Sequence, residues 1–175
     1  TKTFASVIGG TQALTLIDID NTSTFNEAIS ATNINVADSI TATAKKAITA
    51  TAIVLDAGTL VLSDNNSVTI AGTINGSNTT EGTLQITGAT KTFSGAIGTT
   101  QALTLIDIDG TSIFNAAVRA TNIDNDGTAT FKSNVTAATA NDGTLTLTPN
   151  GDNNITHSGA ITGSGTLNAV EADDG

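Results

Sequence analysis

The chain of 175 residues contains no cysteine, methionine, tryptophan or tyrosine, and it has a single proline. Without cysteine it cannot form a disulfide framework or the usual structural zinc sites. Aromatic residues make up 3% of the chain and charged residues 13%, the latter about half the level of ordinary globular domains. No apolar run approaches the roughly 20 residues of a membrane helix, and no signal peptide is visible. We therefore expect no membrane-spanning segment.

The few charges are mostly negative, which bears on the partners of the chain. Its formal net charge is −10, and its six basic residues are spread between Lys2 and Lys132 without forming a patch. Binding of nucleic acid is dominated by cationic contacts to phosphate, so this balance argues against a nucleic-acid partner. The acidic, cysteine-free composition predicts an extracellular protein.

Threonine, glycine and branched aliphatic residues replace what is missing. There are 35 threonines and 17 glycines, and apolar residues reach 38% of the chain. A disordered chain usually combines low hydrophobicity with a high density of charge, which is not the case here. Isoleucine, valine and leucine alternate with threonine, a pattern typical of β-strands.

The sequence contains a large internal repeat. Thr1-Lys2-Thr3-Phe4 recurs as Thr90-Lys91-Thr92-Phe93, an offset of 89 residues, and 25 positions are identical between 1–35 and 90–124. Residues 12–20 recur without change as 101–109. The sequence therefore predicts a first large repeat over 1–89 and a second over 90–175, within a single solenoid over 1–175.

A shorter unit lies within each large repeat. Its signature is a bulky residue, two variable positions, a small residue and then isoleucine or valine. The eight occurrences are Phe4 to Ile8, Phe25 to Ile29, Ala44 to Ile48, Ile70 to Ile74, Phe93 to Ile97, Phe114 to Val118, Phe131 to Val135 and His157 to Ile161. Their spacings are 21, 19, 26, 23, 21, 17 and 26 residues, which indicates four units of about 22 residues in each large repeat.

These units predict an all-β fold, a right-handed parallel β-solenoid, also called a β-helix, with coils of about 22 residues. The phenylalanines and the Ile/Val positions should form ladders along the axis. A bend is expected at the third signature position, which holds Glu27 and Lys46, because a charge cannot enter a dry core unpaired. Glycines 58, 82, 143 and 165 should each precede a second strand. The alternative is two tandem antiparallel β-sandwich repeats of about 89 residues each.

Two stretches, Gly82-Thr83-Leu84-Gln85-Ile86 and Thr92-Phe93-Ser94-Gly95-Ala96-Ile97-Gly98, resemble the β-strand repeats of giant bacterial surface proteins. These include autotransporter passenger domains, filamentous haemagglutinin-like adhesins and S-layer proteins. The resemblance covers the whole chain and is compositional. It implies an extracellular location and a role in adhesion or surface coating, and it assigns no functional residue.

The chain begins and ends in the same phase of the repeat. Residues 166–175 correspond to 83–89, which precede Thr90. We therefore expect either a segment of a longer array or subunits that stack end to end, so that the main partner is another copy of the chain or a neighbouring repeat.

Aspartates are the candidate metal ligands. Asp18 and Asp20 recur as Asp107 and Asp109, and each pair lies two residues apart on one strand face. Asp124 and Asp126, followed by Gly127, resemble the first half of a calcium loop, although Ser133 stands where the loop needs glutamate. Ca²⁺ is the expected cofactor at these six aspartates. The competing interpretation is that Asn, Asp and Gly are ordinary turn residues.

No catalytic residue is predicted. The aspartate pairs recur in both large repeats, which favours architecture over a unique active site, and Arg119 and His157 stand in different units. His157 should occupy a ladder position that phenylalanine fills elsewhere. The expected function is a structural, self-assembling or tandemly repeated building block of an extracellular fibre, sheath or surface layer. The alternatives are a stalk segment of a large adhesin and, more remotely, a polysaccharide-acting enzyme.

Overall fold

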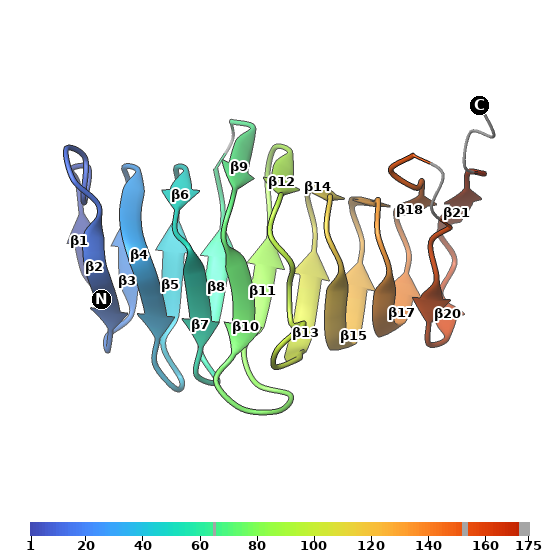
Figure 1. Cartoon of the computed structure of the whole chain (residues 1–175), viewed down its shortest axis with the longest axis horizontal. Coiled ribbons are helices and arrows are strands. Elements are labelled where there is room, and N and C mark those ends of the chain that lie inside the picture. The colour runs from blue at the N-terminus through green and yellow to red at the C-terminus, as the bar shows by residue number, and fades with distance from the viewer. Residues whose placement is uncertain (65, 152–153, 172–175) are drawn as a thin grey trace.

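The structure is a computed structural model that describes residues 1–64, 66–151 and 154–171. The described chain is all-β, and its strands pair in parallel to form a solenoid of about nine coils. The strands stand side by side along the long axis, with β1 and β21 at opposite ends of the stack (Figure 1). The predicted parallel solenoid is therefore confirmed, and the tandem antiparallel sandwich is wrong because the strands of the described residues pair in parallel.

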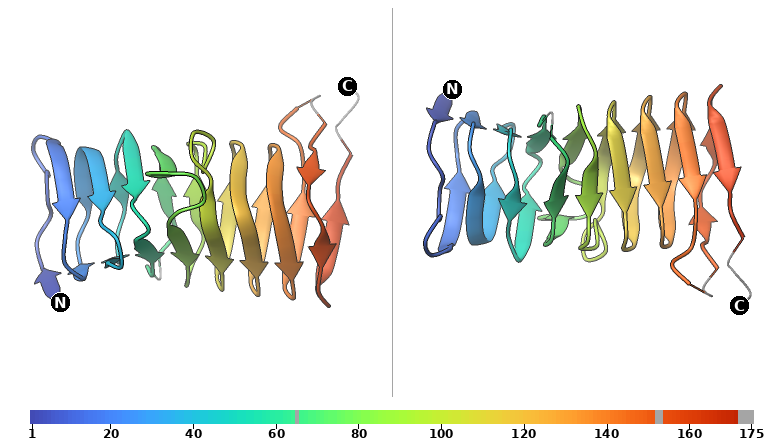
Figure 2. Two further views of the ribbon diagram at one scale, coloured as in Figure 1. Left: turned by 90° about the horizontal axis from the view of Figure 1, so that it is seen from below. Right: turned by 90° about the horizontal axis from the view of Figure 1, so that it is seen from above.

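Three parallel sheets build the walls of the solenoid. Sheet 1 contains β1 (Lys2–Phe4), β3 (Ser23–Phe25), β5 (Thr41–Ala44), β8 (Thr59–Leu62), β11 (Thr83–Ile86), β13 (Leu103–Ile108), β15 (Val118–Asn125), β17 (Val135–Asn141), β19 (His157–Ser158) and β20 (Ile161–Thr162). Sheet 2 contains β2 (Leu14–Ile19), β4 (Ile29–Val36), β6 (Ile48–Thr49), β7 (Ala52–Leu55) and β10 (Thr73–Gly76). Sheet 3 contains β9 (Val68–Ile70), β12 (Lys91–Phe93), β14 (Thr111–Phe114), β16 (Thr128–Phe131), β18 (Thr144–Leu147) and β21 (Thr166–Ala169). Figure 2 shows these walls from two further sides.

Inward-pointing side chains form columns along the core, and three of these columns, one on each side of the coil, contain the signature residues. Column 1 consists of Phe4, Phe25, Ala44, Leu62, Ile86, Ile108, Asn125 and Asn141. Column 2 consists of Ile8, Ile29, Ile48, Ile70, Phe93, Phe114, Phe131, Leu147 and Ala169. Column 3 consists of Ile17, Ile34, Ile53, Ile74, Ile97, Val118, Val135 and His157. Successive coils thus add one side chain to each column, and the core exists only because the coils are stacked.

The aromatic rings stack within these columns. Phe4 lies on Phe25 with ring centroids 4.9 Å apart, and Phe93, Phe114 and Phe131 stack at 4.9 and 4.6 Å with interplanar angles of 7°. The coil-to-coil spacing of a parallel sheet is about 4.8 Å, so in-register strands bring identical rings into offset contact. The predicted phenylalanine ladder is therefore present, but in two separate stacks.

The bends of each coil follow the prediction. The chain bends at the third signature position in all eight units, and Glu27 and Lys46 lie outside the strands there. At three of these positions glycine is needed for space, because a Cβ on Gly72, Gly95 or Gly159 would lie within 2.2 Å of a carbonyl oxygen of the preceding coil. The predicted strands after Gly58, Gly82, Gly143 and Gly165 are β8, β11, β18 and β21, so this prediction is also confirmed.

The predicted coil length and count need correction. Steps along column 1 range from 16 to 24 residues, and about 19 is typical, rather than 22. Phe4 lies in column 1 but its counterpart Phe93 lies in column 2. Each coil has three sides, here called faces, and each face carries one of the three columns. A large repeat therefore consists of four complete coils and one further face. The second large repeat is therefore turned by one face relative to the first.

The extra face enters where the signature spacing is longest. The two spacings of 26 residues, from Ala44 to Ile70 and from Phe131 to His157, each move the signature from one column to the next. The intervening places in the old column are taken by Leu62 and Leu147. For the same reason His157 pairs with Val135 in column 3, and its expected place in a phenylalanine ladder is wrong.

The described residues contain strands and turns only, so no helix is present there that could cross a membrane.

Candidate functional site

Five aspartate side chains form a row along the outer surface of sheet 1. Asp107 in β13 pairs in register with Asp124 in β15, so the two side chains lie next to each other on the outer face. Asp109, Asp126 and Asp142 each follow the last residue of their strand by one position, at successive coils. The row (Asp107, Asp109, Asp124, Asp126 and Asp142) therefore combines four of the predicted metal ligands with one that was not predicted.

The pKa of Asp107 reflects this crowding. Partial burial raises the pKa of its carboxyl above the ordinary value, and the negative charges of Asp109, Asp124 and Asp126 raise it further. Gln85 in β11 opposes this rise, because its Nε2 donates a hydrogen bond of 3.0 Å to Oδ2 of Asp107. Asp107 therefore takes up a proton more readily than an ordinary exposed aspartate.

At the far end of the row, Asp142 is held in its charged form. The backbone N–H and the hydroxyl of Ser164 each donate a hydrogen bond of 2.8 Å to Oδ1 of Asp142. These two bonds lower the pKa of the Asp142 carboxyl, although the side chain is open to solvent. The row thus contains Asp107, which is crowded by other carboxylates, and Asp142, which accepts hydrogen bonds from Ser164 of the next coil.

An Asn-Asp-Gly corner positions the aspartates of the row. Asn125 and Asn141 point into the core, where Nδ2 of Asn125 donates to Oδ1 of Asn141 at 2.6 Å. Strand alternation then places the following aspartate outside. The glycines that come next are packed against one another, since a Cβ on Gly127 would lie 2.1 Å from the carbonyl oxygen of Gly110. Any larger residue would push adjacent coils apart at this corner.

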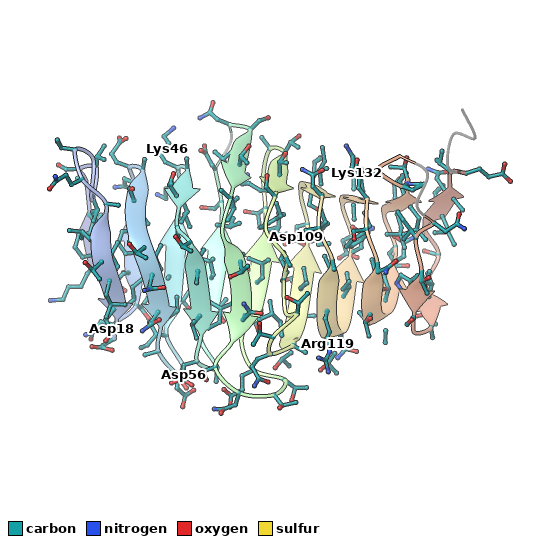
Figure 3. All side chains as sticks on the ribbon, viewed as in Figure 1. Asp18, Lys46, Asp56, Asp109, Arg119 and Lys132 are labelled. Atoms are coloured by element: carbon teal, nitrogen blue, oxygen red, sulfur yellow. The ribbon has the colours of Figure 1, made fainter. Side chains whose placement is uncertain are left out.

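The structure separates the other predicted pair from this row. Asp18 and Asp20 are exposed, and Asp18 lies in β2 of sheet 2 opposite Asn35 instead of another carboxylate. Figure 3 shows Asp18 at the N-terminal end of the stack and Asp109 near the middle. The turn of one face between the large repeats explains why residues with identical sequence neighbours lie on different sheets.

The six predicted calcium ligands do not surround a common point. Residues 118–125 form the extended strand β15 instead of a loop, so Asp124 and Asp126 are spread along the surface. Among the described residues, no group of three or more His, Cys, Asp or Glu side chains is close enough to hold a metal ion. An ion at this row would be shared between neighbouring coils, with water completing its shell.

Arg119 and His157 do not join the carboxylate row. Arg119 is exposed near the start of β15, on the lower edge of the stack in Figure 3. His157 is half-buried, and its Nε2 lies 3.0 Å from the hydroxyl of Thr139. Burial lowers the pKa of His157, which favours the neutral imidazole. These positions do not bring an acid, a base and a carboxylate together in one place.

The sequence analysis missed the buried charge of Lys91, which lies near the buried Asp64. Its side chain is fully buried, and its Nζ donates to the carbonyl oxygens of Asp64, Thr87 and Ala89 at 2.7, 3.2 and 2.6 Å. Burial lowers the pKa of Lys91, and the Asp64 carboxylate partly offsets this. The burial of Lys91 could have been predicted from strand alternation, because Lys91 stands two residues before the inward Phe93 and so points the same way.

Comparison with protein-family models, with curated proteins and with solved structures finds no match to this chain. The fold is consistent with the β-strand repeats of bacterial surface proteins that the composition resembles.

Proposed function

We propose that this chain is a structural segment of an extracellular bacterial fibre, sheath or surface layer, which is extended by stacking further coils on its ends. The observation that carries the proposal is the continuity of the three core columns from the first coil to the last. A repeat architecture of this kind gains stability from each neighbour and grows along one axis without changing its cross-section. Such growth suits a rod or a lattice element.

The surface of the rod supports a structural role. Outward positions of the strands carry mostly threonine, together with alanine, asparagine and aspartate, as in β5 and β16. The chain is acidic, and charge of one sign keeps rods soluble and apart. In the described residues, the imidazole of His157 and the guanidinium of Arg119 lie away from the carboxylate row. This arrangement favours a scaffold over a polysaccharide-acting enzyme.

Immunogold electron microscopy tests the proposed location and role together. Antibodies against the purified chain should label the surface of intact cells of the source bacterium, along filaments or over a continuous layer. Antibodies against a cytoplasmic protein are the control and should label only permeabilised cells. Labelling of this chain only after permeabilisation would falsify the proposal.

A stalk segment of a large adhesin is the second candidate for the same rod. It is favoured by the turn of one face between large repeats, which lets identical repeats follow one another without interrupting any column. The coding sequence around this segment decides between the two. Further repeats and a distinct terminal binding domain in the same reading frame indicate a stalk, whereas a short reading frame indicates a separate subunit.

We also propose that calcium stabilises the carboxylate row. The pairing of Asp107 with Asp124 supports this idea, because two carboxylates on adjacent coils repel each other unless a cation lies between them. Calcium suits such an exposed site, since it accepts carboxylate and water oxygens in flexible geometry. The binding would be weak, in the millimolar range typical of extracellular modules.

Thermal unfolding with and without calcium checks the role of the row. Calcium chloride should raise the unfolding temperature more than sodium chloride of equal ionic strength. The double variant D107N/D124N should lose this extra stabilisation, and the matched control D18N/D20N should keep it. Equal effects of the two salts on the wild-type chain would rule out a calcium site.

A further inference from the structure

The chain contains one complete example of how the start of a large repeat packs on the end of another. At this internal junction, β12 pairs with β9, β13 pairs with β11, and Ile97 forms a bridge to Ile74. The strands β12 and β13 begin the second large repeat, whereas β9, β10 and β11 end the first. All three faces of the solenoid continue across the junction.

At the N-terminal end, the same residues lack this cover. Phe4 is 41% exposed, whereas its counterpart Phe93 is 1% exposed, and Leu14 is 44% exposed, whereas Leu103 is fully buried. Lys2 is likewise exposed, although Lys91 is buried. The local sequences are nearly identical, so the difference comes from the neighbouring coil alone. The internal junction therefore shows what kind of surface covers β1 and β2.

The C-terminal end shows the complementary difference. Leu167 in β21 is 50% exposed, whereas Leu84 at the equivalent place in β11 is fully buried beneath β13. Val170 is also exposed. The free edge of β21 therefore presents the pairing positions that β11 uses at the internal junction.

We infer that the two ends bind each other between copies of this chain, head to tail, in the geometry of the internal junction. In that register β1 of one copy pairs with β19 of the next, and β2 pairs with β21. Ile17 then lies opposite Leu167, as Ile106 lies opposite Leu84 within the chain. Because each copy contains two large repeats, each copy is turned by two faces relative to the last. This inference rests on the proposed function, since it names the partner that extends the rod.

Polar groups fit the same register. Asp18 comes to lie opposite Asn168, which reproduces the hydrogen-bonded pair of Asp107 and Gln85 at the internal junction. Because the strands pair in parallel, the two ends are different surfaces, and only a head-to-tail contact continues the parallel pairing. A contact of this type is heterologous, and along a straight axis it yields open filaments instead of closed dimers.

Two variants that each block one end test the inference in the full chain. F4D/L14D places charges at the N-terminal end, and L167D places one at the C-terminal end. These side chains are already about half exposed, so the monomer should fold normally by circular dichroism. In a head-to-tail contact, however, each charge would be buried without a partner, which is strongly unfavourable. T24D, on the outer face of β3, is the matched control.

Analytical ultracentrifugation over a range of concentrations gives the readout. Wild type and T24D should form a ladder of oligomers, and each blocked variant alone should remain monomeric, with association weakened at least tenfold. An equal mixture of the two blocked variants should give 1:1 dimers and nothing larger, because each retains one open end. A monomeric wild type at its highest soluble concentration overturns the inference, as does a blocked variant that assembles like wild type. Either result leaves surface labelling of cells, the test of the proposed function, unaffected.

Discussion

Lys2 and Lys91 occupy the same position in the two large repeats, yet only Lys91 enters the core. The second repeat is covered by preceding coils, so the Lys91 ammonium exchanges water for the carbonyl oxygens of Asp64, Thr87 and Ala89. A buried ammonium is tolerated only when its donors are satisfied. Lys91 therefore links the corner at 87–89 to the preceding coil, at the point where the two large repeats meet.

Replacing Lys91 by methionine keeps the apolar stem of the side chain and removes its donors. K91M should lower the free energy of unfolding by about 3 kcal/mol, because it leaves three carbonyl oxygens without their partner. Urea denaturation followed by circular dichroism measures the change. K2M is the matched control at the exposed position and should shift stability by less than about 0.5 kcal/mol. Equal effects of the two substitutions would contradict the role given to Lys91.

At the scale of the strands, the charged form of Asp107 destabilises the fold at neutral pH. The pKa of Asp107 is raised in the folded state, so the folded chain binds this proton more readily than the unfolded chain does. Stability should therefore rise as the pH falls through the folded pKa of Asp107 towards the unfolded value near 4. The gain is complete once the carboxyl is protonated in both states.

The variant D107N isolates this contribution. It should stabilise the fold at pH 7 by roughly 0.5 kcal/mol, since it removes repulsion between directly opposed like charges. The difference from wild type should shrink in acid, where Asp107 is protonated. Denaturation midpoints measured between neutral and acidic pH provide the test. D18N is the control, because Asp18 faces Asn35 instead of another carboxylate, and it should not stabilise the fold at pH 7. A destabilising D107N at neutral pH would be the opposite outcome.

The sequence predicted the strands and bends well, because these follow from local rules. Alternation placed Phe25, Phe93 and Phe114 inside, and charged Glu27 and Lys46 revealed the bend. The position of each strand among the sheets could not be predicted in this way, because it depends on how many residues the turns absorb. The spacing of 26 residues before Ile70 and His157 held the signal, but a longer turn would give the same number. The meeting of Asp107 with Asp124 depends on that register as well.

For the whole molecule, stability should vary along the axis. Each coil touches only its neighbours, so the end coils have one stabilising interface and the central coils have two. Hydrogen exchange measured by mass spectrometry should show the slowest amides between β11 and β15 and faster exchange in β1, β2 and β21. Uniform protection along the chain would indicate that the solenoid opens only as one unit.

The turn of one face per large repeat has a consequence for any longer rod. The threonine-bearing strands β1, β3 and β5 lie over column 1, and their counterparts β12, β14 and β16 lie over column 2. A third repeat would place them over column 3, and a fourth would return to the first direction. All three faces of such a filament therefore carry the threonine-bearing strands in turn. Neighbouring filaments or glycans that approach from any side would meet the same side chains at regular intervals, which favours packing in bundles over packing in flat ribbons.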